Sequence, residues 1–569
     1  MERDSHRERK PREDREPRGD RERERRPSWS KDASAEGRRP PWEHRYSKDA
    51  DRTQARPSGP SPSAQKAADD IEAEFDFSTV SPPLKTLPPR FLSPPLVDGL
   101  LQSVHALLGP DARPTPIQSL SLKHLFTPPV DDLPYRQFLL ASETGSGKSL
   151  AYLLPMLQDI KQAEADRPRT PGPLPEPRGL VLAPTHELSR QLAGFAKALI
   201  HNIKLRVQST SRANVASAAA NSRVSASKMA EAFGTGGEGE FEVTRGGAGH
   251  AVDVLVGTPS KVLEMVRGNG WDHDARVARE DAERGRERER EAPKRKWVVG
   301  RPELGLANVE WVVVDEADIL FDPDFIEQTR TLLSDVAQAR GASGTDTPFN
   351  LILTSATIPA SLAAHLDAHH PRMTRLVSPH LHRLPSALEL EFSPYASGNR
   401  HADVERRLRD VWSADALAGR PPSRVVVFGN TRTGVDEFGR FLSGKGIENV
   451  AVTGAGGRAH GSNKHLEGFL RPVMPQAQME GAAKEREAEG PRVLLSTSLL
   501  ARGLDFDASV SHVFVLDPPR NTADFLHRAG RTARAGRVGK VVVFERADGR
   551  GSERGREMKR RIRALKARK

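Results

Sequence analysis

The chain has 569 residues, of which 29 % are charged, 36 % hydrophobic and only 5 % aromatic, so part of it is expected to lie outside any packed core. It contains no cysteine, which excludes disulfides, thiolate zinc sites and a cysteine nucleophile, and no apolar run approaches the ~18 residues of a membrane-spanning helix, which predicts a soluble protein without membrane contacts. The net charge is +11, of which residues 546–569 carry +8, and a basic tail on a nearly neutral body favours contact with a polyanion, nucleic acid before an anionic membrane.

Residues 1–83 alternate Arg with Glu or Asp and then become rich in Pro and Ser. They lack hydrophobic periodicity, which predicts a disordered charged extension. The segment is also a poor targeting signal. Transit peptides avoid acidic residues, whereas the first 30 residues here contain nine Asp and Glu.

From residue 84 onward, short apolar runs alternate with helical stretches, a pattern typical of buried parallel strands in α/β units. The runs lie at 137–142, 179–185, 252–258, 311–318 and 351–357 and, after a break, at 424–431, 492–498, 512–517 and 540–545. These two groups predict two α/β domains with parallel sheets, at 84–378 and 405–545, joined by a linker at 379–404.

Four polar segments interrupt this pattern. They are expected to be surface insertions, because structureless loops of such length are unusual inside a compact domain. They lie at 161–178, 209–250 and 268–303 in the first domain and at 474–491 in the second. The chain ends in a basic tail at 546–569, with 11 Lys and Arg against 3 Asp and Glu. Either contact with nucleic acid or a solvated terminus would explain this tail.

A glycine-rich turn, Ala-Ser-Glu-Thr-Gly-Ser-Gly-Lys-Ser at 141–149, follows the first apolar run. Between a strand and a helix, such a turn aims backbone N–H groups at phosphate oxygens. Lys148 would reach the β- and γ-phosphates, and Ser149 would hold Mg²⁺ through its hydroxyl. The generic pattern has Gly where this chain has Ser142. The predicted nucleotide-binding loop consists of Ser142, Glu143, Thr144, Gly145, Ser146, Gly147, Lys148 and Ser149.

Two later segments supply acidic and basic groups for such a site. The run at 311–318 ends in Asp315, placed to hold Mg²⁺ through water, and Glu316, placed to orient or deprotonate the attacking water. An acidic pair at this point could instead cap the next helix. Arg531 and Arg534 are three residues apart and would share one helix face, from which they could reach a γ-phosphate as arginine fingers. A basic surface helix is the alternative.

Taken in order, these motifs resemble the DEAD-box ATP-dependent RNA helicases, whose box is here Asp315-Glu316-Ala317-Asp318. The other family motifs are similar to RPTPIQ (113–118), ASETGSGKS (141–149), APTHELSRQL (183–192), TPSK (258–261), SAT (355–357), VVVFGNT (425–431), STSLLARGLDF (496–506) and HRAGRTARAG (527–536). The resemblance spans roughly 84–545. It implies two RecA-like domains, the cofactors ATP and Mg²⁺, and RNA-stimulated ATP hydrolysis coupled to local duplex unwinding or RNA–protein remodelling.

The resemblance also implies roles for residues outside the loop. Gln118 would read adenine and make the enzyme selective for ATP, and Asp505 would contact the ribose or the γ-phosphate. Ser355 and Thr357 would link the ATP site to the RNA site. The residues expected along the RNA are Thr185, Glu187, Thr258, Pro259, Arg502 and Gly503.

The chain departs from the family pattern at His186, where Arg is usual, and at Ser498, where Asp is usual. The Gln-x-x-Arg element of the family has no clear counterpart at 459–469. THELSRQ, DEADILFDPDF and PRNTADFLHRAGRTARAG are most similar to fungal mitochondrial RNA helicases, which implies mitochondrial RNA metabolism, with a nucleolar or cytosolic role as the alternative.

We expect a monomer that holds RNA mainly through its backbone, with little sequence preference, and that can work with protein cofactors. The basic tail is expected to raise RNA affinity without taking part in catalysis. Two rival functions stay open. One is a DNA translocase of the wider helicase superfamily, and the other is an RNA clamp or scaffold that hydrolyses ATP weakly or not at all.

Overall fold

The protein is represented by a computed structural model. It describes residues 70, 74–75, 87–92, 94–126, 135–167, 174–210, 251–273, 299–341, 348–452, 463–474, 490–498, 502–534, 537–546 and 553–567. All of them lie in one compact unit. Among the helices in these ranges, none combines the length and apolarity needed to cross a bilayer.

The first sheet has seven parallel strands in the order β3-β4-β2-β5-β6-β1-β7. The strands are β1 (Gln137–Ala141), β2 (Gly179–Leu182), β3 (Val207–Ser209), β4 (Val254–Gly257), β5 (Trp311–Val314), β6 (Asn350–Ser355) and β7 (Thr374–Val377). The interior strands β2, β4 and β5 are buried along their whole length, because helices cover both faces of a parallel sheet.

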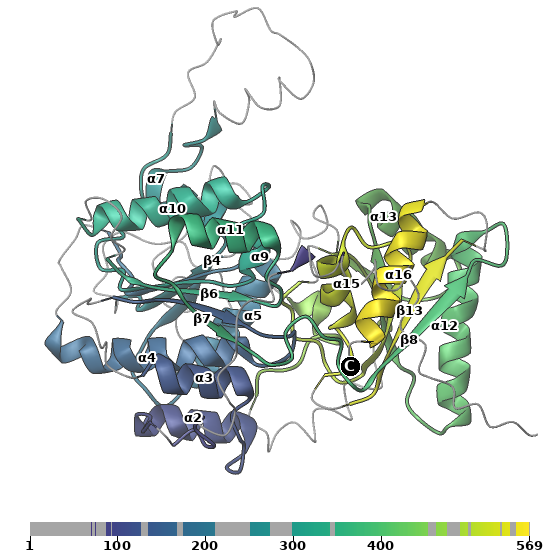
Figure 1. The fold of residues 1–569 in the computed structure, drawn as a ribbon, viewed down its shortest axis with the longest axis horizontal. Helices are drawn as coiled ribbons and strands as arrows, with labels where there is room; N and C mark the ends of the chain where they lie inside the picture. Colours follow the sequence, from purple (N-terminus) through teal and green to yellow (C-terminus); the bar gives the residue numbers. More distant parts are fainter. Residues whose placement is uncertain are drawn as a thin grey trace, which may run out of the picture. The chain divides into compact units, whose positions relative to one another are not determined.

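Helices cover the first sheet on two sides, with α3 and α4 on one face and α10 and α11 on the other (Figure 1). The helices of this domain are α2 (Asp98–Leu108), α3 (Pro116–His124), α4 (Lys148–Asp166), α5 (His186–Leu199), α7 (Pro259–Arg267), α9 (Ala317–Leu320), α10 (Ile326–Ala339) and α11 (Ala360–His369). Two separate groups of buried apolar side chains, one against each face, hold these layers together.

The second sheet has six parallel strands in the order β10-β11-β9-β12-β13-β8. They are β8 (Leu388–Pro394), β9 (Arg424–Gly429), β10 (Asn449–Val452), β11 (Val493–Thr497), β12 (Val510–Val515) and β13 (Gly539–Glu545), with helices α12 (Arg400–Leu417), α13 (Arg432–Gly444), α15 (Thr522–Ala529) and α16 (Glu553–Ala567). The predicted fold class of two α/β domains with parallel sheets is confirmed.

The strand order brings the predicted site segments together. In the first sheet β6 pairs with both β1 and β5, and all three are parallel. Their carboxyl ends therefore meet at one edge, where ligands of open α/β sheets bind. The loop after β1, the acids after β5 and Ser355 at the end of β6 lie at this edge.

The segment 379–404 is more than a linker, because it contains β8 and the first residues of α12. β8 pairs with β13 as an edge strand of the second sheet. The segment 161–178 also begins as structure, since α4 continues to Asp166. Most of the residues in the other three predicted insertions lie outside the described ranges.

Nearly all of the predicted disordered extension 1–83 lies outside the described residues, but Glu74 and Phe75 are packed. Phe75 is 3 % exposed and stacks on His382, which lies between β7 and β8, with ring centroids 4.2 Å apart. The Glu74 carboxylate accepts hydrogen bonds from the backbone N–H groups of Thr522, at 2.8 Å, and Ala523, at 3.3 Å. Packed structure therefore begins before residue 84, and Glu74 caps the N-terminus of α15.

The basic tail is not a solvated terminus, because residues 553–567 form α16, which packs against α15. Met558, Ile562 and Leu565 are at most 5 % exposed and belong to the core. Their spacing places them on one face of the helix, and the basic side chains occupy the others. The prediction for this segment rested on its charge, and the seven Arg and Lys of α16 obscured the three apolar residues on its buried face.

Because α16 closes the core of the second domain, we expect Ile562→Ala to lower the free energy of unfolding by about 2–4 kcal/mol. The exposed Lys566 on the same helix provides the control, and Lys566→Ala should change stability by less than about 0.5 kcal/mol. Chemical denaturation of both variants measures the difference. Equal stability of the two variants would show that α16 is only loosely attached.

Candidate active site

The loop between β1 and α4 is shaped by two glycines in the left-handed region, Gly145 with φ 81° and Gly147 with φ 85°. A residue with a Cβ is strained in this conformation, so the loop requires glycine at both positions. The ammonium group of Lys148 donates to the carbonyl oxygens of Ser142, at 2.9 Å, and Glu143, at 3.1 Å. Burial lowers the pKa of Lys148, while Glu316, Asp315 and Glu143 oppose this effect.

Asp315 and Glu316 directly follow β5 and are each 4 % exposed. The Asp315 carboxylate accepts hydrogen bonds from the hydroxyl of Thr354 and from the backbone N–H of Glu316, the latter at 3.0 Å. Burial, together with the neighbouring Glu316, raises the pKa of Asp315 to about 6. A neighbouring cation would therefore favour the ionised form of Asp315.

Glu316 has a backbone φ of 53°, which is uncommon for a residue other than glycine. Glu316 lies at the N-cap of the short helix α9, and its side chain makes no capping hydrogen bond there. Its Oε2 atom has no hydrogen-bond partner among the described residues, and Nδ1 of His527 lies 3.9 Å away. A buried carboxylate oxygen with this free capacity can accept a proton or a hydrogen bond from water.

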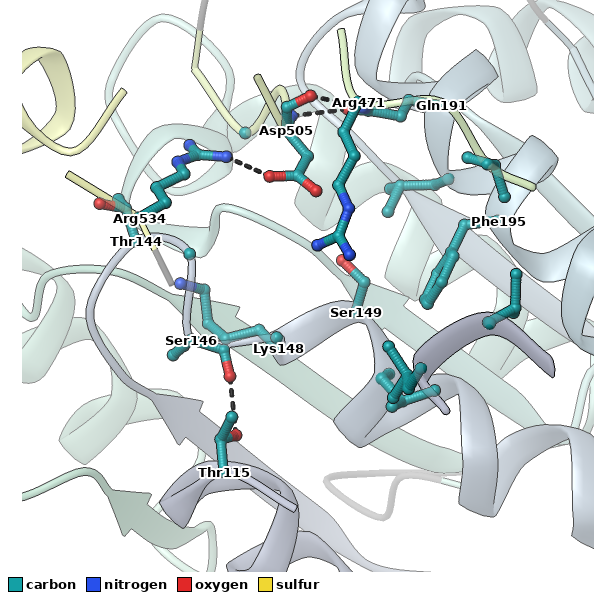
Figure 2. A pocket seen from close by; sticks show the side chains of 18 of the residues that line it. Thr115, Thr144, Ser146, Lys148, Ser149, Gln191, Phe195, Arg471, Asp505 and Arg534 are labelled. Carbon is teal, nitrogen blue, oxygen red and sulfur yellow. Dashed lines mark hydrogen bonds and ion pairs between the residues drawn. The ribbon is translucent and has the colours of Figure 1, made fainter. Parts of the chain in front are cut away.

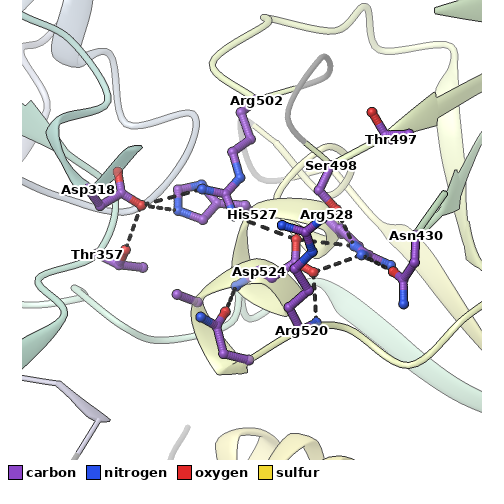
Figure 3. A network of polar contacts seen from close by, with 12 residues as sticks. Asp318, Thr357, Asn430, Thr497, Ser498, Arg502, Arg520, Asp524, His527 and Arg528 are labelled. Carbon is purple, nitrogen blue, oxygen red and sulfur yellow. Dashed lines mark hydrogen bonds and ion pairs between the residues drawn. The ribbon is translucent and has the colours of Figure 1, made fainter. Parts of the chain in front are cut away.

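Asp318, the last residue of the box, joins the two domains (Figure 3). It accepts hydrogen bonds from Ser355, at 2.9 Å, and Thr357, at 3.0 Å, and it pairs with His527 of the second domain at 2.7 Å. Burial alone would raise the pKa of Asp318, but His527 and Arg502 hold it well below its usual range. Ser355 and Thr357, the predicted coupling residues, therefore bond to the same Asp318 carboxylate that pairs with His527 of the second domain.

Arg531 and Arg534 do not share a helix face, because α15 ends at Ala529. Arg531 is 2 % exposed and donates to the carbonyl oxygens of His527 and Leu504, each at 2.8 Å, but its Nη2 has no partner among the described residues. Burial, reinforced by the neighbouring Arg534, lowers the pKa of Arg531 to about 9. Arg534 forms an ion pair with Asp505 (Figure 2).

A cavity of about 390 Å³ lies among these groups. Most of the predicted ATP-site residues line it, from both domains. They are Gln118, Thr144, Gly145, Ser146, Gly147, Lys148, Ser149, Asp315, Glu316, Asp505, Arg531 and Arg534, together with Gly503. Ser142 and Glu143 are not among the residues that line the cavity, but their carbonyl oxygens accept hydrogen bonds from the Lys148 ammonium group.

Gln118 lies in α3 and is 6 % exposed. Its Oε1 accepts from the backbone N–H of Thr115 at 2.9 Å, and its Nε2 donates to the carbonyl oxygen of Gly147 at 3.1 Å. A carboxamide has two N–H donors and two lone pairs, so one of each is left after these bonds. Gln118 can therefore hold the loop and still pair with one edge of a base.

The predicted RNA residues of the first domain lie at helix N-termini on the same sheet edge. Thr185 caps α5 by accepting from the N–H of Leu188 at 3.3 Å, and Glu187 lies in the first turn of that helix. Thr258 caps α7, whose first residue is Pro259. The N-termini of two neighbouring helices carry partial positive charge, which suits a phosphate backbone.

The predicted RNA residues of the second domain lie close to the ATP-site network. Arg502 is 3.9 Å from Asp318 and 3.6 Å from Asp524. Gly503 has a φ of 72°, and a Cβ at this position would come within 2.3 Å of the Leu188 side chain. Glycine is therefore required here for the close approach of the two domains.

The network around Arg528 explains one departure from the family pattern (Figure 3). The guanidinium is 1 % exposed and donates to Asp524 at 2.7 Å, to Asn430 at 2.6 Å and to the hydroxyl of Ser498 at 2.7 Å. Although burial would raise the pKa of Asp524, Arg528 and Arg502 lower it to about 2. Ser498 thus supplies an acceptor where the family usually has Asp, and Asp524 supplies the charge.

Several residues of the site were not predicted. Thr354, which precedes the SAT motif, bonds to Asp315, and Asn463 donates to the carbonyl oxygen of Glu187 at 2.9 Å. Arg471 also lines the cavity. Thr354 could have been found from its position at the end of an apolar run, whereas Asn463 and Arg471 have no signal in the sequence.

Two family descriptions match the chain. The DEAD/DEAH box helicase family matches residues 115–365, and the helicase conserved C-terminal domain matches residues 410–536. The mitochondrial ATP-dependent RNA helicase MRH4 of Cryptococcus neoformans var. neoformans serotype D (strain B-3501A) is 35 % identical over 502 residues, 79 % of this chain and 81 % of that protein. The protein of the same name from Pyricularia oryzae (strain 70-15) is 27 % identical over 531 residues, 81 % of this chain and 71 % of that protein.

Solved structures share the fold. S. cerevisiae Dbp5 bound to RNA and ADP BeF3 has a TM-score of 0.52 at 18 % identity, covering 84 % of this chain and 93 % of that chain. Mss116p bound to single-stranded RNA and AMP-PNP has a TM-score of 0.51 at 16 % identity, covering 83 % of this chain and 76 % of that chain. These likenesses confirm the two RecA-like domains. Together with the family matches, they lead to one conclusion: the chain belongs to the DEAD-box family of ATP-dependent RNA helicases.

Proposed function

We propose that the cavity is an ATP site in which Glu316 and Arg531 act on the same phosphate from opposite domains. The observation that carries this proposal is that both side chains line one cavity and each keeps a polar atom, Oε2 and Nη2, without a hydrogen-bond partner among the described residues. Leaving such atoms unpaired in the interior costs free energy. A water molecule at Glu316 and a phosphate oxygen at Arg531 would satisfy both.

The donor set near the loop fits Mg²⁺, which prefers oxygen ligands and keeps several waters. The hydroxyl of Ser149 and the carboxylate of Asp315 line the same cavity. These two residues would hold the ion, which would supply positive charge to the phosphate oxygens. The raised pKa of Asp315 supports this proposal, because a cation removes the cost of ionising a buried acid.

In this proposal Glu316 orients the attacking water and takes its proton through Oε2. Lys148 and Arg531 balance the charge that develops on the phosphate. Asp318 connects this chemistry to domain closure, since its carboxylate bonds to Ser355 and Thr357 on one side and His527 on the other. Loss of the γ-phosphate would weaken the domain contacts at Arg531 and release the closed arrangement.

We propose that RNA binds along the N-termini of α5 and α7, near Thr185 and Thr258, and that Arg502 and Gly503 complete the surface from the second domain. Backbone recognition of this kind gives little sequence preference. A closed arrangement that accepts only a bent strand would separate a short duplex. We further propose that the protein acts as a monomer, with protein cofactors, in mitochondrial RNA metabolism, which the names of the fungal relatives support.

The test compares ATP hydrolysis stimulated by RNA and by DNA of the same sequence, together with ATP-dependent separation of a short RNA duplex. We expect stimulation by RNA and separation that stops when Mg²⁺ is chelated. Equal stimulation by DNA would favour a DNA translocase, and RNA binding without single-turnover hydrolysis would favour a clamp. Imaging of the full-length protein with a C-terminal tag separates a mitochondrial location from a nucleolar or cytosolic one.

Replacing Gln118 with Ala should raise the KM for ATP about tenfold or more and remove the preference for ATP over GTP. The free N–H and lone pair of this amide match the edge of adenine, whereas guanine would leave them mispaired. Steady-state hydrolysis of both nucleotides measures the effect, with the exposed Gln102 on α2 as the matched control, Gln102→Ala. Equal hydrolysis of ATP and GTP by the parent protein would refute this role.

A further inference from the structure

Arg471 comes from a segment of the second domain that is held firmly at its backbone. Phe469 and Leu470 are buried, and Leu470 forms an antiparallel bridge with Phe506. The N–H of Arg471 donates to the carbonyl oxygen of Asp505 at 2.9 Å. The backbone of Arg471 is thus fixed beside a residue that lines the cavity, although its side chain is exposed.

The side chain of Arg471 lies in the cavity itself. Arg471 lines it together with the loop residues, and Figure 2 shows the guanidinium pointing toward Ser149. In the proposed ATP site Ser149 is a ligand of Mg²⁺, which bridges the β- and γ-phosphates. A side chain next to Ser149 is therefore next to these phosphates. Arg471 therefore approaches the phosphate chain from the second domain at a point separate from Arg531 and Arg534.

The guanidinium of Arg471 has no hydrogen bond or ion pair with any other residue that the structure describes. The other cations at the phosphate end of the cavity are engaged. Lys148 donates to two loop carbonyl oxygens, Arg531 donates to two backbone carbonyl oxygens, and Arg534 pairs with Asp505. Arg471 can direct its whole guanidinium at a phosphate, whereas Lys148 and Arg534 already use part of their donors within the protein.

Asp505 links the position of Arg471 to the first domain. Its backbone exchanges two hydrogen bonds with the Gln191 side chain, from Gln191 Nε2 to the carbonyl oxygen at 3.1 Å and from the Asp505 N–H to Oε1 at 2.8 Å. The same carbonyl oxygen accepts from Arg471. Contact between the domains at Gln191 therefore fixes the backbone that carries Arg471.

We propose that Arg471 is an additional nucleotide-binding residue, which the second domain supplies to the phosphate chain of a nucleoside di- or triphosphate. The inference rests on the proposed ATP site and adds to it a contact that the arginines after α15 do not make. The planar guanidinium can donate two parallel hydrogen bonds to phosphate oxygens, which a lysine cannot do. Because it lies on the side of Ser149, we infer that it contacts the β-phosphate, which ADP retains.

The test measures the binding of Mg·ADP and of a non-hydrolysable ATP analogue to the full chain with saturating RNA, together with kcat and KM for ATP. Arg471→Ala should weaken both nucleotides about 10- to 100-fold, raise KM by a similar factor and leave kcat within about threefold. Arg471→Lys should recover only part of the loss. Arg440→Ala removes an exposed arginine from α13 in the same domain, outside the cavity, and should behave as the parent.

Each outcome decides one point. If Arg471→Ala binds nucleotides as Arg440→Ala does, the inference is wrong while the ATP site stands. A lowered kcat with unchanged KM would also overturn it, because the residue would then act in the transition state. Failure of the parent to bind ATP would refute the proposed function itself. An unfolding temperature of Arg471→Ala within about 2 °C of the parent excludes a folding defect. If the difference is larger, the test is repeated with Arg471→Met, which keeps most of the aliphatic stem.

Discussion

Glu316→Gln is expected to lower the rate of RNA-stimulated ATP hydrolysis at least about 100-fold while ATP and RNA still bind. The amide keeps the shape of the side chain but cannot take a proton at the position of Oε2. This atom has no hydrogen-bond partner among the described residues, so the substitution breaks no bond of the folded protein there. Single-turnover hydrolysis and nucleotide binding, measured on the same preparation, separate the chemical step from affinity.

The exposed Glu389 at the start of β8 gives the matched control, since Glu389→Gln removes one carboxylate from the surface. It should hydrolyse ATP at the parent rate. A rate for Glu316→Gln above about a tenth of the parent rate would mean that another group activates the water. The strained backbone at Glu316, with φ 53°, would then have only a structural role.

Arg531→Ala is expected to lower kcat about 1000-fold, the range known for arginine fingers, while affinity for ADP changes only a few-fold. The free Nη2 atom of this buried side chain can reach a phosphate oxygen, but its other donors are used for the carbonyl oxygens of His527 and Leu504. Arg531→Lys should not restore activity, because a single ammonium nitrogen cannot take the separate positions of Nε, Nη1 and Nη2, from which the guanidinium makes these contacts.

The exposed Arg537 lies six residues further along the chain, and Arg537→Ala serves as the control. Thermal unfolding of all three variants shows whether the loss of the two carbonyl contacts weakens the fold. The finger role would be refuted by a kcat for Arg531→Ala within tenfold of the parent. A loss of ADP binding as large as the loss of rate would instead assign Arg531 to ground-state binding.

All strands that the apolar runs predict are present, and the four that were missed are the sheet edges. The missed strands are β3, β7, β8 and β10. An interior strand has neighbours on both sides and helices on both faces, so nearly every residue is apolar. An edge strand is less buried, as β10 shows with only Val452 buried and β8 with only Leu388. Its sequence therefore lacks the continuous run by which a parallel strand is recognised.

The site could be predicted where its chemistry lies in consecutive residues, as in the loop ending at Lys148 and the pair Asp315-Glu316. Both Arg531 and Arg534 line the cavity, as predicted. The argument from helical spacing was nevertheless wrong, because neither residue lies on a helix. Gly530 ends α15, where a Cβ would come within 1.7 Å of Thr144 Oγ1, and Ala533 adopts φ 56°. Contacts such as that of Arg471 depend on how two distant segments meet, which spacing along the chain does not encode.

The contacts of Glu74 and Phe75 limit where the chain can be cut without loss of packed structure. Cleavage after Phe75 would deprive α15 of its carboxylate cap and uncover the ring face of His382, whose Nε2 accepts from the N–H of Ile358 directly after the SAT motif. It would also remove the Glu74 carboxylate, which lies 3.3 Å from Arg561 of α16 and is one of the acids that pair with it. A cut that preserves these contacts must therefore lie upstream of Glu74, since Glu74 and Phe75 connect to α15 and α16 on one side and to His382 on the other.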